Sequence, residues 1–176
     1  SFDTSKVTNM YYTFSNCSSL ASLDLSSFNT SMVADMTRIF GGCSSLTSLD
    51  LSSFDTSNVA DMSHMFVNCI LLNTIYVSNF WTIAATKYST NMFYGCTSLM
   101  GAIPYNDSVI DKTHANYQTG YLTYKFYADY FKNKFVVSGT DINNIANAIR
   151  AKTGTLDGLI FPDGFIAAIE SLGVAA

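Results

Sequence analysis

SSLTSLDLSSFDTSNVADMSHMFVNC, residues 44–69, is the stretch that decides the fold. Residues 18–43 repeat it with 18 of 26 positions identical, and weaker copies lie on either side. A repeat at a fixed period of this length is typical of proteins in which each structural unit stacks on its neighbours. The sequence therefore predicts an array of stacked coils over residues 1–104.

Within one copy, the spacing of apolar residues predicts a short strand followed by a helix. Alternation in the strand would turn Leu49 and Leu51 inward and Asp50 towards water. After the strand, apolar residues recur at steps of three and four, which is one face of a helix: Val59, Met62, Phe66 and Cys69. We therefore expect an α/β repeat, a right-handed leucine-rich-repeat solenoid of about four turns with short parallel strands and helices.

Stacking would place equivalent side chains of successive copies in columns. Leu23, Leu49 and Ile75 would form one column, and a phenylalanine recurs in every copy to form another. The cysteines also recur once per copy, without a C-x-x-C motif or a nearby pair of histidines, which argues against zinc. Parallel Cβ directions suit a disulfide poorly, so we expect free, buried packing residues: Cys17, Cys43, Cys69 and Cys96.

The chain changes character after residue 104. Tyrosine and phenylalanine crowd residues 105–137, and bulky aromatics suit a C-terminal cap over the open end of a repeat array. The alternative is that some of these rings form a ligand surface. Residues 138–176 predict a small helical hairpin, too short to be firmly stable alone, through which the protein would self-associate. Since SFDTSKV at the start matches residues 53–59, we also expect the chain to be a fragment that begins inside a repeat.

Composition and charge exclude several classes of function. The chain has 176 residues, 48% of them hydrophobic, and a net charge of −4 with nine scattered Lys and Arg residues, which argues against nucleic-acid binding. No apolar run reaches the roughly 20 residues of a membrane-spanning helix, so we expect no direct membrane insertion. His64 and His114 have no nucleophile at a recognisable spacing, so we expect no enzyme, metal or cofactor.

The outward positions of the predicted strands form the candidate binding surface. They change from polar to aromatic towards the C-terminus: Asp24, Asp50, Tyr76, Ile103 and Tyr105. Exposed tyrosines commonly contact protein or sugar, although a cap that folds over these residues would bury them. The two carboxylates would lie roughly 5 Å apart on adjacent strands. They are either a weak calcium site or simply two solvated side chains.

The repeat also resembles a known family. SLTSLDLSSFDTSNVADMSHMF at residues 45–66 closely resembles the BspA-like leucine-rich repeats of bacterial surface proteins. The segment DKTHANYQTGYLTYK at residues 111–125 is similar to the segment after the last repeat in that group, so the resemblance covers residues 1–125. It implies a secreted or wall-attached extracellular protein that contacts a host or neighbouring-cell surface protein, and it implies no catalytic residues.

A second, shorter resemblance lies near the C-terminus. IANAIRAKTGTLDGLIFPDGFIAAIESL at residues 145–172 is similar to segments of phage tail and prophage structural proteins. We therefore expect a non-enzymatic, adhesion-type protein-binding module at the cell surface. The alternatives are a phage-tail-like assembly component and a carbohydrate-binding surface module.

Overall fold

The computed structural model describes residues 3–125. The chain divides into two compact units, Ser1–Phe126 and Tyr127–Ala176, and the described residues belong to the first. The helical hairpin predicted for residues 138–176 lies outside the described residues, as does the last part of the predicted cap, residues 126–137.

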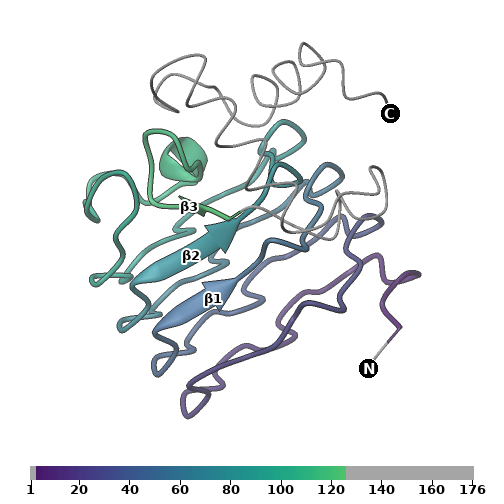
Figure 1. The fold of residues 1–176 in the computed structure, drawn as a ribbon, viewed down its shortest axis with the longest axis horizontal. Helices are drawn as coiled ribbons and strands as arrows, with labels where there is room; N and C mark the ends of the chain where they lie inside the picture. The colour runs from purple at the N-terminus through teal and green to yellow at the C-terminus, as the bar shows by residue number, and fades with distance from the viewer. Residues whose placement is uncertain (1–2, 126–176) are drawn as a thin grey trace, which may run out of the picture. The chain divides into compact units, whose positions relative to one another are not determined.

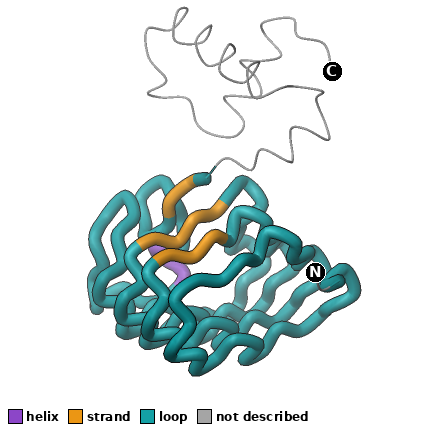
Figure 2. Tube along the Cα trace, turned by 60° about the horizontal axis from the view of Figure 1, so that its bottom comes forward, coloured by secondary structure: helices purple, strands orange, loops and turns teal. Residues whose placement is uncertain are grey.

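Three short strands and one 3-10 helix are the regular elements of the described part. They are β1 (Ser48–Asp50), β2 (Thr74–Val77), η1 (Lys112–His114) and β3 (Thr123–Tyr124). The strands form one parallel sheet in the order β1-β2-β3 (Figure 1). Ser48 pairs with Thr74, one repeat further along the chain, so β2 lies beside the strand of the preceding coil. Figure 2 shows the strands on one side of the stacked coils.

The predicted α/β class is wrong, because residues 3–125 contain no α-helix and a right-handed solenoid with helices does not fit them. The segment predicted as a helix is a run of tight turns whose N–H groups alternate between two kinds of partner. One set bonds three residues back: Met65 to Met62 at 3.2 Å, Val67 to His64 at 3.1 Å and Cys69 to Phe66 at 3.1 Å. The other set bonds the next coil: Met62 to Tyr88 at 2.9 Å, His64 to Thr90 at 2.8 Å, Phe66 to Met92 at 2.9 Å and Asn68 to Tyr94 at 2.7 Å.

Backbone conformation explains why these turns look like a helix in the sequence. His64 and Asn68 both have φ of 58°, which a helix excludes and which the third residue of a type II turn requires. Each turn returns the chain to the same side after three or four residues, so the apolar spacing mimics helical periodicity. Asparagine or glycine, the residues that best tolerate positive φ, fills the second of these positions in every coil: Asn16, Gly42, Asn68 and Gly95.

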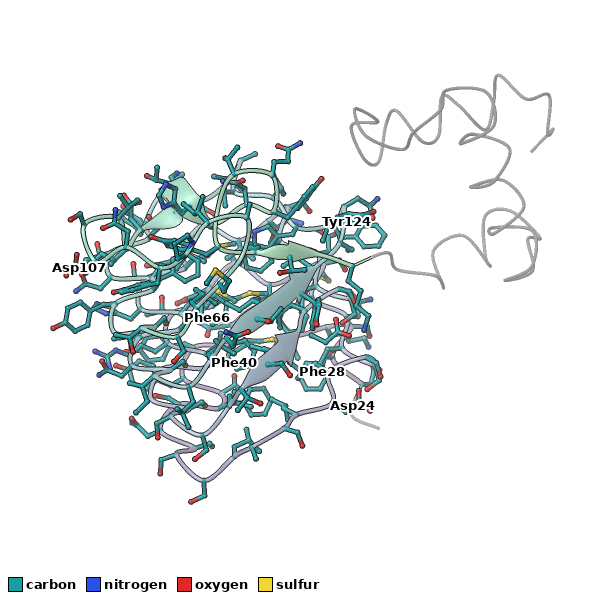
Figure 3. All side chains as sticks on the ribbon, turned by 60° about the vertical axis from the view of Figure 1, so that its left-hand side comes forward. Asp24, Phe28, Phe40, Phe66, Asp107 and Tyr124 are labelled. Carbon is teal, nitrogen blue, oxygen red and sulfur yellow. The ribbon has the colours of Figure 1, made fainter. Side chains whose placement is uncertain are left out.

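The phenylalanine column and the Leu49–Ile75 part of the leucine column are confirmed in the core. Leu49 lies directly opposite Ile75 in the β1–β2 pair, and both side chains are buried. The phenylalanine rings form a stacked column in which Figure 3 labels Phe40 and Phe66. Successive ring centroids lie 5.8, 5.8 and 5.5 Å apart from Phe14 through Phe40 and Phe66 to Phe93. Apolar burial between coils, rather than a core within any one coil, therefore stabilises the fold.

Polar side chains add bonds between the coils. Thr30 Oγ1 donates to the Asp55 carbonyl at 2.9 Å, and Thr56 Oγ1 donates to the Thr82 carbonyl at 2.7 Å. The cysteine column acts in the same way, each thiol donating to a phenylalanine carbonyl of the previous coil: Cys43 to Phe14 at 3.0 Å, Cys69 to Phe40 at 3.1 Å and Cys96 to Phe66 at 2.9 Å. These three cysteines are buried as predicted, whereas Cys17 is exposed.

The stack does not continue as a strand through residues 97–104. Leu99 is buried, but Met100 bridges Pro104 in antiparallel fashion, so the chain reverses and leaves Pro104 exposed. Gly101 makes the reversal possible, because a Cβ there would lie 2.4 Å from the Tyr121 backbone. The strand beside β2 is instead β3, with Tyr76 opposite Thr123.

Candidate functional site

The five predicted surface residues lie in two separate places. Asp24, Asp50 and Tyr76 follow the strand side of the coils, and Asp50 and Tyr76 are directly opposed in the β1–β2 register. Ile103 and Tyr105 belong to the reversed segment and line a hollow with parts of the two preceding coils. The predicted continuous row is therefore wrong, because β3 occupies the place beside β2 that residue 103 was expected to fill.

Lys125 closes over the strand side of the sheet. Its Nζ forms an ion pair with Asp50 and lies 5.6 Å from the centroid of the Tyr76 ring. Its backbone N–H donates to the Val77 carbonyl at 2.7 Å, which fixes the segment after β3 against the sheet. Tyr76 is consequently half-buried, as the alternative of a covering segment had anticipated.

The carboxylates of Asp24 and Asp50 accept hydrogen bonds from the backbone of their own turns. Asp24 Oδ1 accepts the Ser26 N–H and Asp50 Oδ1 accepts the Ser52 N–H, each at 3.0 Å. Hydrogen bonds from the Ser26 backbone and side chain lower the pKa of Asp24. For Asp50, burial alone would raise the pKa, but bonds from Lys125 and Ser52 and the lysine charge outweigh it and lower the pKa. Within residues 3–125, no group of three His, Cys, Asp or Glu side chains could hold a metal ion.

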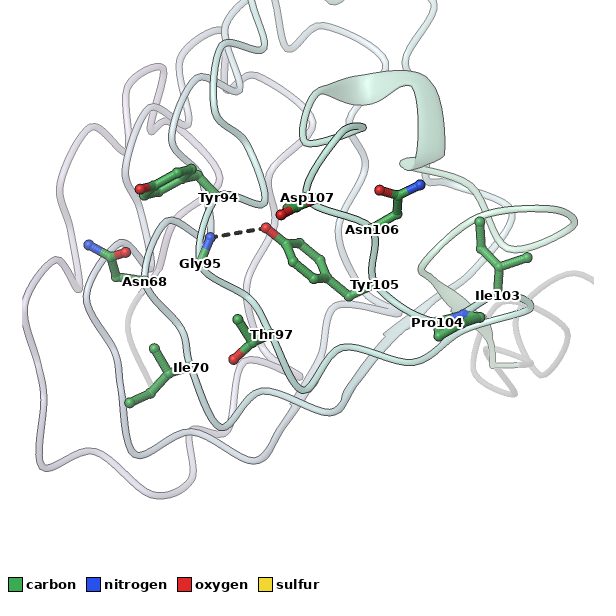
Figure 4. A pocket seen from close by; sticks show the side chains of 10 residues that line it. All are labelled: Asn68, Ile70, Tyr94, Gly95, Thr97, Ile103, Pro104, Tyr105, Asn106 and Asp107. Carbon is green, nitrogen blue, oxygen red and sulfur yellow. Dashed lines mark hydrogen bonds between the residues drawn. The ribbon is translucent and has the colours of Figure 1, made fainter.

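The hollow is the stronger candidate for a binding site. It has a volume of about 930 Å³ and an open mouth on the side of the last coils (Figure 4). Two large apolar side chains in it are well exposed, Ile70 at 48% and Tyr94 at 54%. The rest of its lining is mostly polar or small: Asn68, Gly95, Thr97, Ile103, Pro104, Tyr105, Asn106 and Asp107.

Tyr105 has a structural part in this hollow. Its hydroxyl accepts the Gly95 N–H at 3.3 Å, and Figure 4 shows the ring reaching across to that backbone. In the preceding coil the equivalent N–H, that of Asn68, donates to the Tyr94 carbonyl of the next coil. Tyr105 thus replaces the acceptor that a further coil would supply, and burial raises the pKa of its hydroxyl. The side chains free to meet a ligand are Ile70, Tyr94 and the polar rim.

Sequence reasoning missed Ile70 and Tyr94, although the repeat contained the signal. Ile70 stands where the previous copy has Ser44, and Tyr94 stands where it has Val67. Both substitutions put a larger apolar side chain at the surface. The packing of the coil does not require either of them. Positions where a larger, exposed apolar side chain replaces the usual repeat residue are candidates for binding, because the other repeat residues already account for the packing of the coil.

The groups of the hollow suit binding rather than bond chemistry. Asn68, Asn106 and Asp107 offer hydrogen-bond donors and acceptors around the exposed apolar pair. His64 and His114 lie elsewhere, each with a buried Nδ1 that has no hydrogen-bond partner among residues 3–125, and His114 packs edge-on against Tyr121. No helix among residues 3–125 has the length and apolar character needed to cross a membrane.

The stacked coils, each built of a strand position and a run of tight turns, define the class as a tandem-repeat protein whose coils share one hydrogen-bond ladder. The chain belongs to the family described as Mycoplasma protein of unknown function, DUF285, whose model matches residues 1–106. That match includes the coils and the first residues of the reversed segment. No curated protein and no solved structure matches the chain significantly.

Proposed function

We propose that this protein is a non-enzymatic, adhesion-type module that binds a surface protein of a host or neighbouring cell through the 930 Å³ hollow. The observation that carries the proposal is the exposure of Ile70 and Tyr94 at positions where the preceding copy has serine and valine. An apolar and aromatic centre with a polar rim is the common composition of protein interfaces. The extracellular, cell-surface location rests on the resemblance to BspA-like repeats.

The experiment replaces the two exposed side chains by the residues that the preceding copy of the repeat has at these positions. Ile70→Ser and Tyr94→Val introduce the residues of the preceding copy, so the double variant should fold with an unchanged unfolding midpoint. Binding is measured by surface plasmon resonance against a panel of purified extracellular-matrix and cell-surface proteins. We expect at least one panel member to bind, and the double variant to weaken that Kd by about tenfold or more.

A matched control separates the hollow from exposed aromatics in general. Tyr11, 55% exposed on the first coil, stands where the next copy has Thr37. Tyr11→Thr removes an equally exposed ring elsewhere and should leave the Kd within about twofold. No binding across the panel, or equal weakening by the control, would reject the proposed site.

Carbohydrate binding is the second candidate, and the same hollow supports it. Sugar rings pack on exposed aromatic faces, and the amides of Asn68 and Asn106 with the Asp107 carboxylate can bond hydroxyl groups. A glycan array distinguishes this candidate, since glycan binding should fall with Tyr94→Val more than with Ile70→Ser. Tyr76 should contribute little to it, because Lys125 packs over the ring.

The phage-tail-like alternative stays a prediction. It rests on residues 145–172, which lie outside the described residues. Light scattering on the full chain and on a variant lacking residues 138–176 tests the expected self-association. A mass that does not change on deletion would remove its support.

A further inference from the structure

One column of the turn run holds side chains that its backbone conformation does not favour. Its four members stand at equivalent positions of successive coils, and all have positive φ: Tyr12 at 59°, Arg38 at 53°, His64 at 58° and Asn91 at 52°. The other column of positive φ contains only asparagine and glycine. Tyrosine and arginine tolerate this conformation less well than asparagine does, and residues held in it often have a binding role. We call these four residues the Arg38 row.

Backbone hydrogen bonds hold the Arg38 row in register. The N–H group of each of the first three members donates to a carbonyl of the next coil: Tyr12 to Thr37 at 3.0 Å, Arg38 to Ser63 at 3.0 Å and His64 to Thr90 at 2.8 Å. Backbones joined in this way lie about 4.8 Å apart. The row therefore crosses the coils as a continuous line of polar side chains.

The guanidinium of Arg38 is the charged centre of the row. It lies over the Tyr12 ring, 5.6 Å from the centroid, and forms no ion pair or side-chain hydrogen bond within residues 3–125. Arg38 belongs to the second coil and has a described coil on either side, so its unpaired donors are a property of a fully flanked position. The planar guanidinium can bind a carboxylate through two parallel hydrogen bonds.

The next two members of the row are neutral at pH 7. Burial, and after it the charge of Arg38, lower the pKa of His64, although the Asp61 carboxylate opposes this shift. The side chains of His64 and Asn91 form no hydrogen bond within residues 3–125. A neutral imidazole and an amide can each both donate and accept, as the hydroxyl groups of a sugar do.

The surroundings of the row limit the charge of a ligand. Asp35 and Asp61 lie in the same turns, where their Oδ1 atoms accept the N–H groups of Thr37 and Ser63, each at 2.8 Å. The whole chain has a net charge of −4. A polyanion would be repelled by these charges, whereas one carboxylate on an otherwise neutral ligand is compatible with a single guanidinium.

We propose that the Arg38 row binds an acidic sugar, with the carboxylate on the guanidinium of Arg38 and the hydroxyl groups towards His64 and Asn91. Two coil spacings separate the backbones of Arg38 and Asn91 by about 10 Å, which is enough for a disaccharide. No member of the row lines the hollow at Tyr94, so this inference is independent of the function proposed for that hollow.

The experiment measures binding of a defined disaccharide to the full chain by isothermal titration calorimetry at pH 7 and low salt. The probe contains one glucuronic acid and one glucose, and the matched probe is the same disaccharide with its carboxyl group reduced to an alcohol. We expect the carboxylated probe to bind and the reduced probe to bind at least about tenfold more weakly.

Two variants locate the site. Arg38→Asn introduces the residue that the fourth coil has at this positive φ, so its unfolding midpoint should be unchanged or higher, and its Kd for the carboxylated probe should be weaker by about tenfold or more. Lys87→Gln removes an exposed positive charge outside the row and should leave the Kd within about twofold. If Arg38→Asn lowers the midpoint, Arg38→Lys keeps the charge without the planar guanidinium and should weaken binding by about threefold or more.

Several results would overturn the proposal. They are the absence of binding by the carboxylated probe, equal binding of the reduced probe, and equal weakening by Lys87→Gln. Tighter binding of an acetylated tetrapeptide with one glutamate, lost in Arg38→Asn, would assign the row to an acidic peptide instead. The double variant Ile70→Ser, Tyr94→Val should bind the carboxylated probe as the unchanged chain does, and a loss there would place the sugar in the hollow.

Discussion

The two ends of the stack differ in how their edges are satisfied. At the C-terminal end, the buried Trp81 Nε1–H donates to the Ala115 carbonyl at 3.0 Å, and the Tyr121 ring packs edge-on against Phe93 at 5.3 Å between centroids. Tyr121 hydroxyl accepts the Asn106 N–H at 3.0 Å. At the N-terminal end, the Phe14 ring is only half-buried, and four carbonyls accept no hydrogen bond from residues 3–125, those of Asn9, Tyr11, Thr13 and Ser15. A coil is thus fully buried only when it has a neighbour on both edges.

The burial of the recurring cysteines shows the same difference, because it increases from the N-terminal to the C-terminal end of the stack. Cys17 is exposed, and Cys43 is buried with a pKa that desolvation raises. Burial raises the pKa of Cys69 to about 12 and that of Cys96 further still. Chemically identical positions therefore differ in how deeply the neighbouring coils and the segment after the last coil bury them, which makes the column a probe of burial along the stack.

The sharpest way to test the comparison is to remove one aromatic side chain at each end. Tyr121→Ala deletes a fully buried ring and its hydroxyl bonds, so we expect a loss of about 3–5 kcal/mol in the free energy of unfolding. Phe14→Ala removes a half-buried ring and should cost about 1–2 kcal/mol. Urea unfolding followed by circular dichroism measures both, and a larger loss at Phe14 would contradict the comparison.

Two alanine variants in the leucine column provide a second comparison of a buried position with a position near the open end. Leu49 is 1% exposed between two coils, so Leu49→Ala should leave a cavity and cost about 2–5 kcal/mol. Leu23 occupies the same position one coil nearer the open end and is half-buried, so Leu23→Ala should cost clearly less. The same urea titration applies, with equal losses at the two sites being the result that would disprove the gradient.

Alkaline pH tests the cysteine gradient. The pKa of the Cys69 thiol is about 12 in the folded chain against 9.0 as its ordinary value, so the folded state holds a proton that the unfolded state releases. Stability therefore falls as pH rises above about 9, and at pH 10 Cys69 alone should cost on the order of 1 kcal/mol relative to pH 8. Burial by neighbouring coils is the cause of the raised pKa.

The control for this titration is the pair of variants Cys69→Ala and Cys17→Ala. The first should reduce the loss of stability between pH 8 and pH 10, because the buried thiol is gone. The second removes an exposed cysteine at the open end and should leave the loss as it is in the unchanged chain. Unfolding midpoints at both pH values decide, and identical pH dependence in the two variants would refute the interpretation.

The sequence predicted the stacking and its columns but not the conformation that joins them. The 26-residue period placed Leu49 opposite Ile75 because side chains at equivalent positions must meet once coils stack. The apolar steps after Val59 did not distinguish a helix from successive turns, since both return the chain to one side every three or four residues. Asn68, with asparagine or glycine at the equivalent positions of the other coils, is the feature of the sequence that favoured a turn with positive φ over a helix.

The candidate site was less predictable for a different reason. Asp50 and Tyr76 were placed correctly on one side of the sheet, but their contact with Lys125 joins residues that are far apart in the chain. The hollow depends on a reversal at Gly101, where the close approach of the Tyr121 backbone decides the path. A contact between two backbone segments outside the repeat cannot be predicted from the periodicity of the sequence.

The smallest expected effect concerns the two strand-side carboxylates. Asp50→Asn keeps the oxygen that accepts the Ser52 N–H but loses the ion pair with Lys125, so we expect a cost of about 0.2–1 kcal/mol at low salt. Asp24→Asn keeps the equivalent turn bond from Ser26 and should be nearly neutral, because Asp24 has no ion-pair partner within residues 3–125.

Salt and pH separate these two variants further. Since the pKa of Asp50 is lowered in the folded chain, its contribution is present above its ordinary value of 3.8 and is lost as pH falls through the lowered value. About 1 M NaCl should also reduce the cost of Asp50→Asn at neutral pH, because the pair is partly exposed and screened. A cost that is insensitive to salt, or equal for Asp24→Asn, would mean that the ion pair contributes nothing and that Lys125 stabilises the sheet only through its backbone bond to Val77.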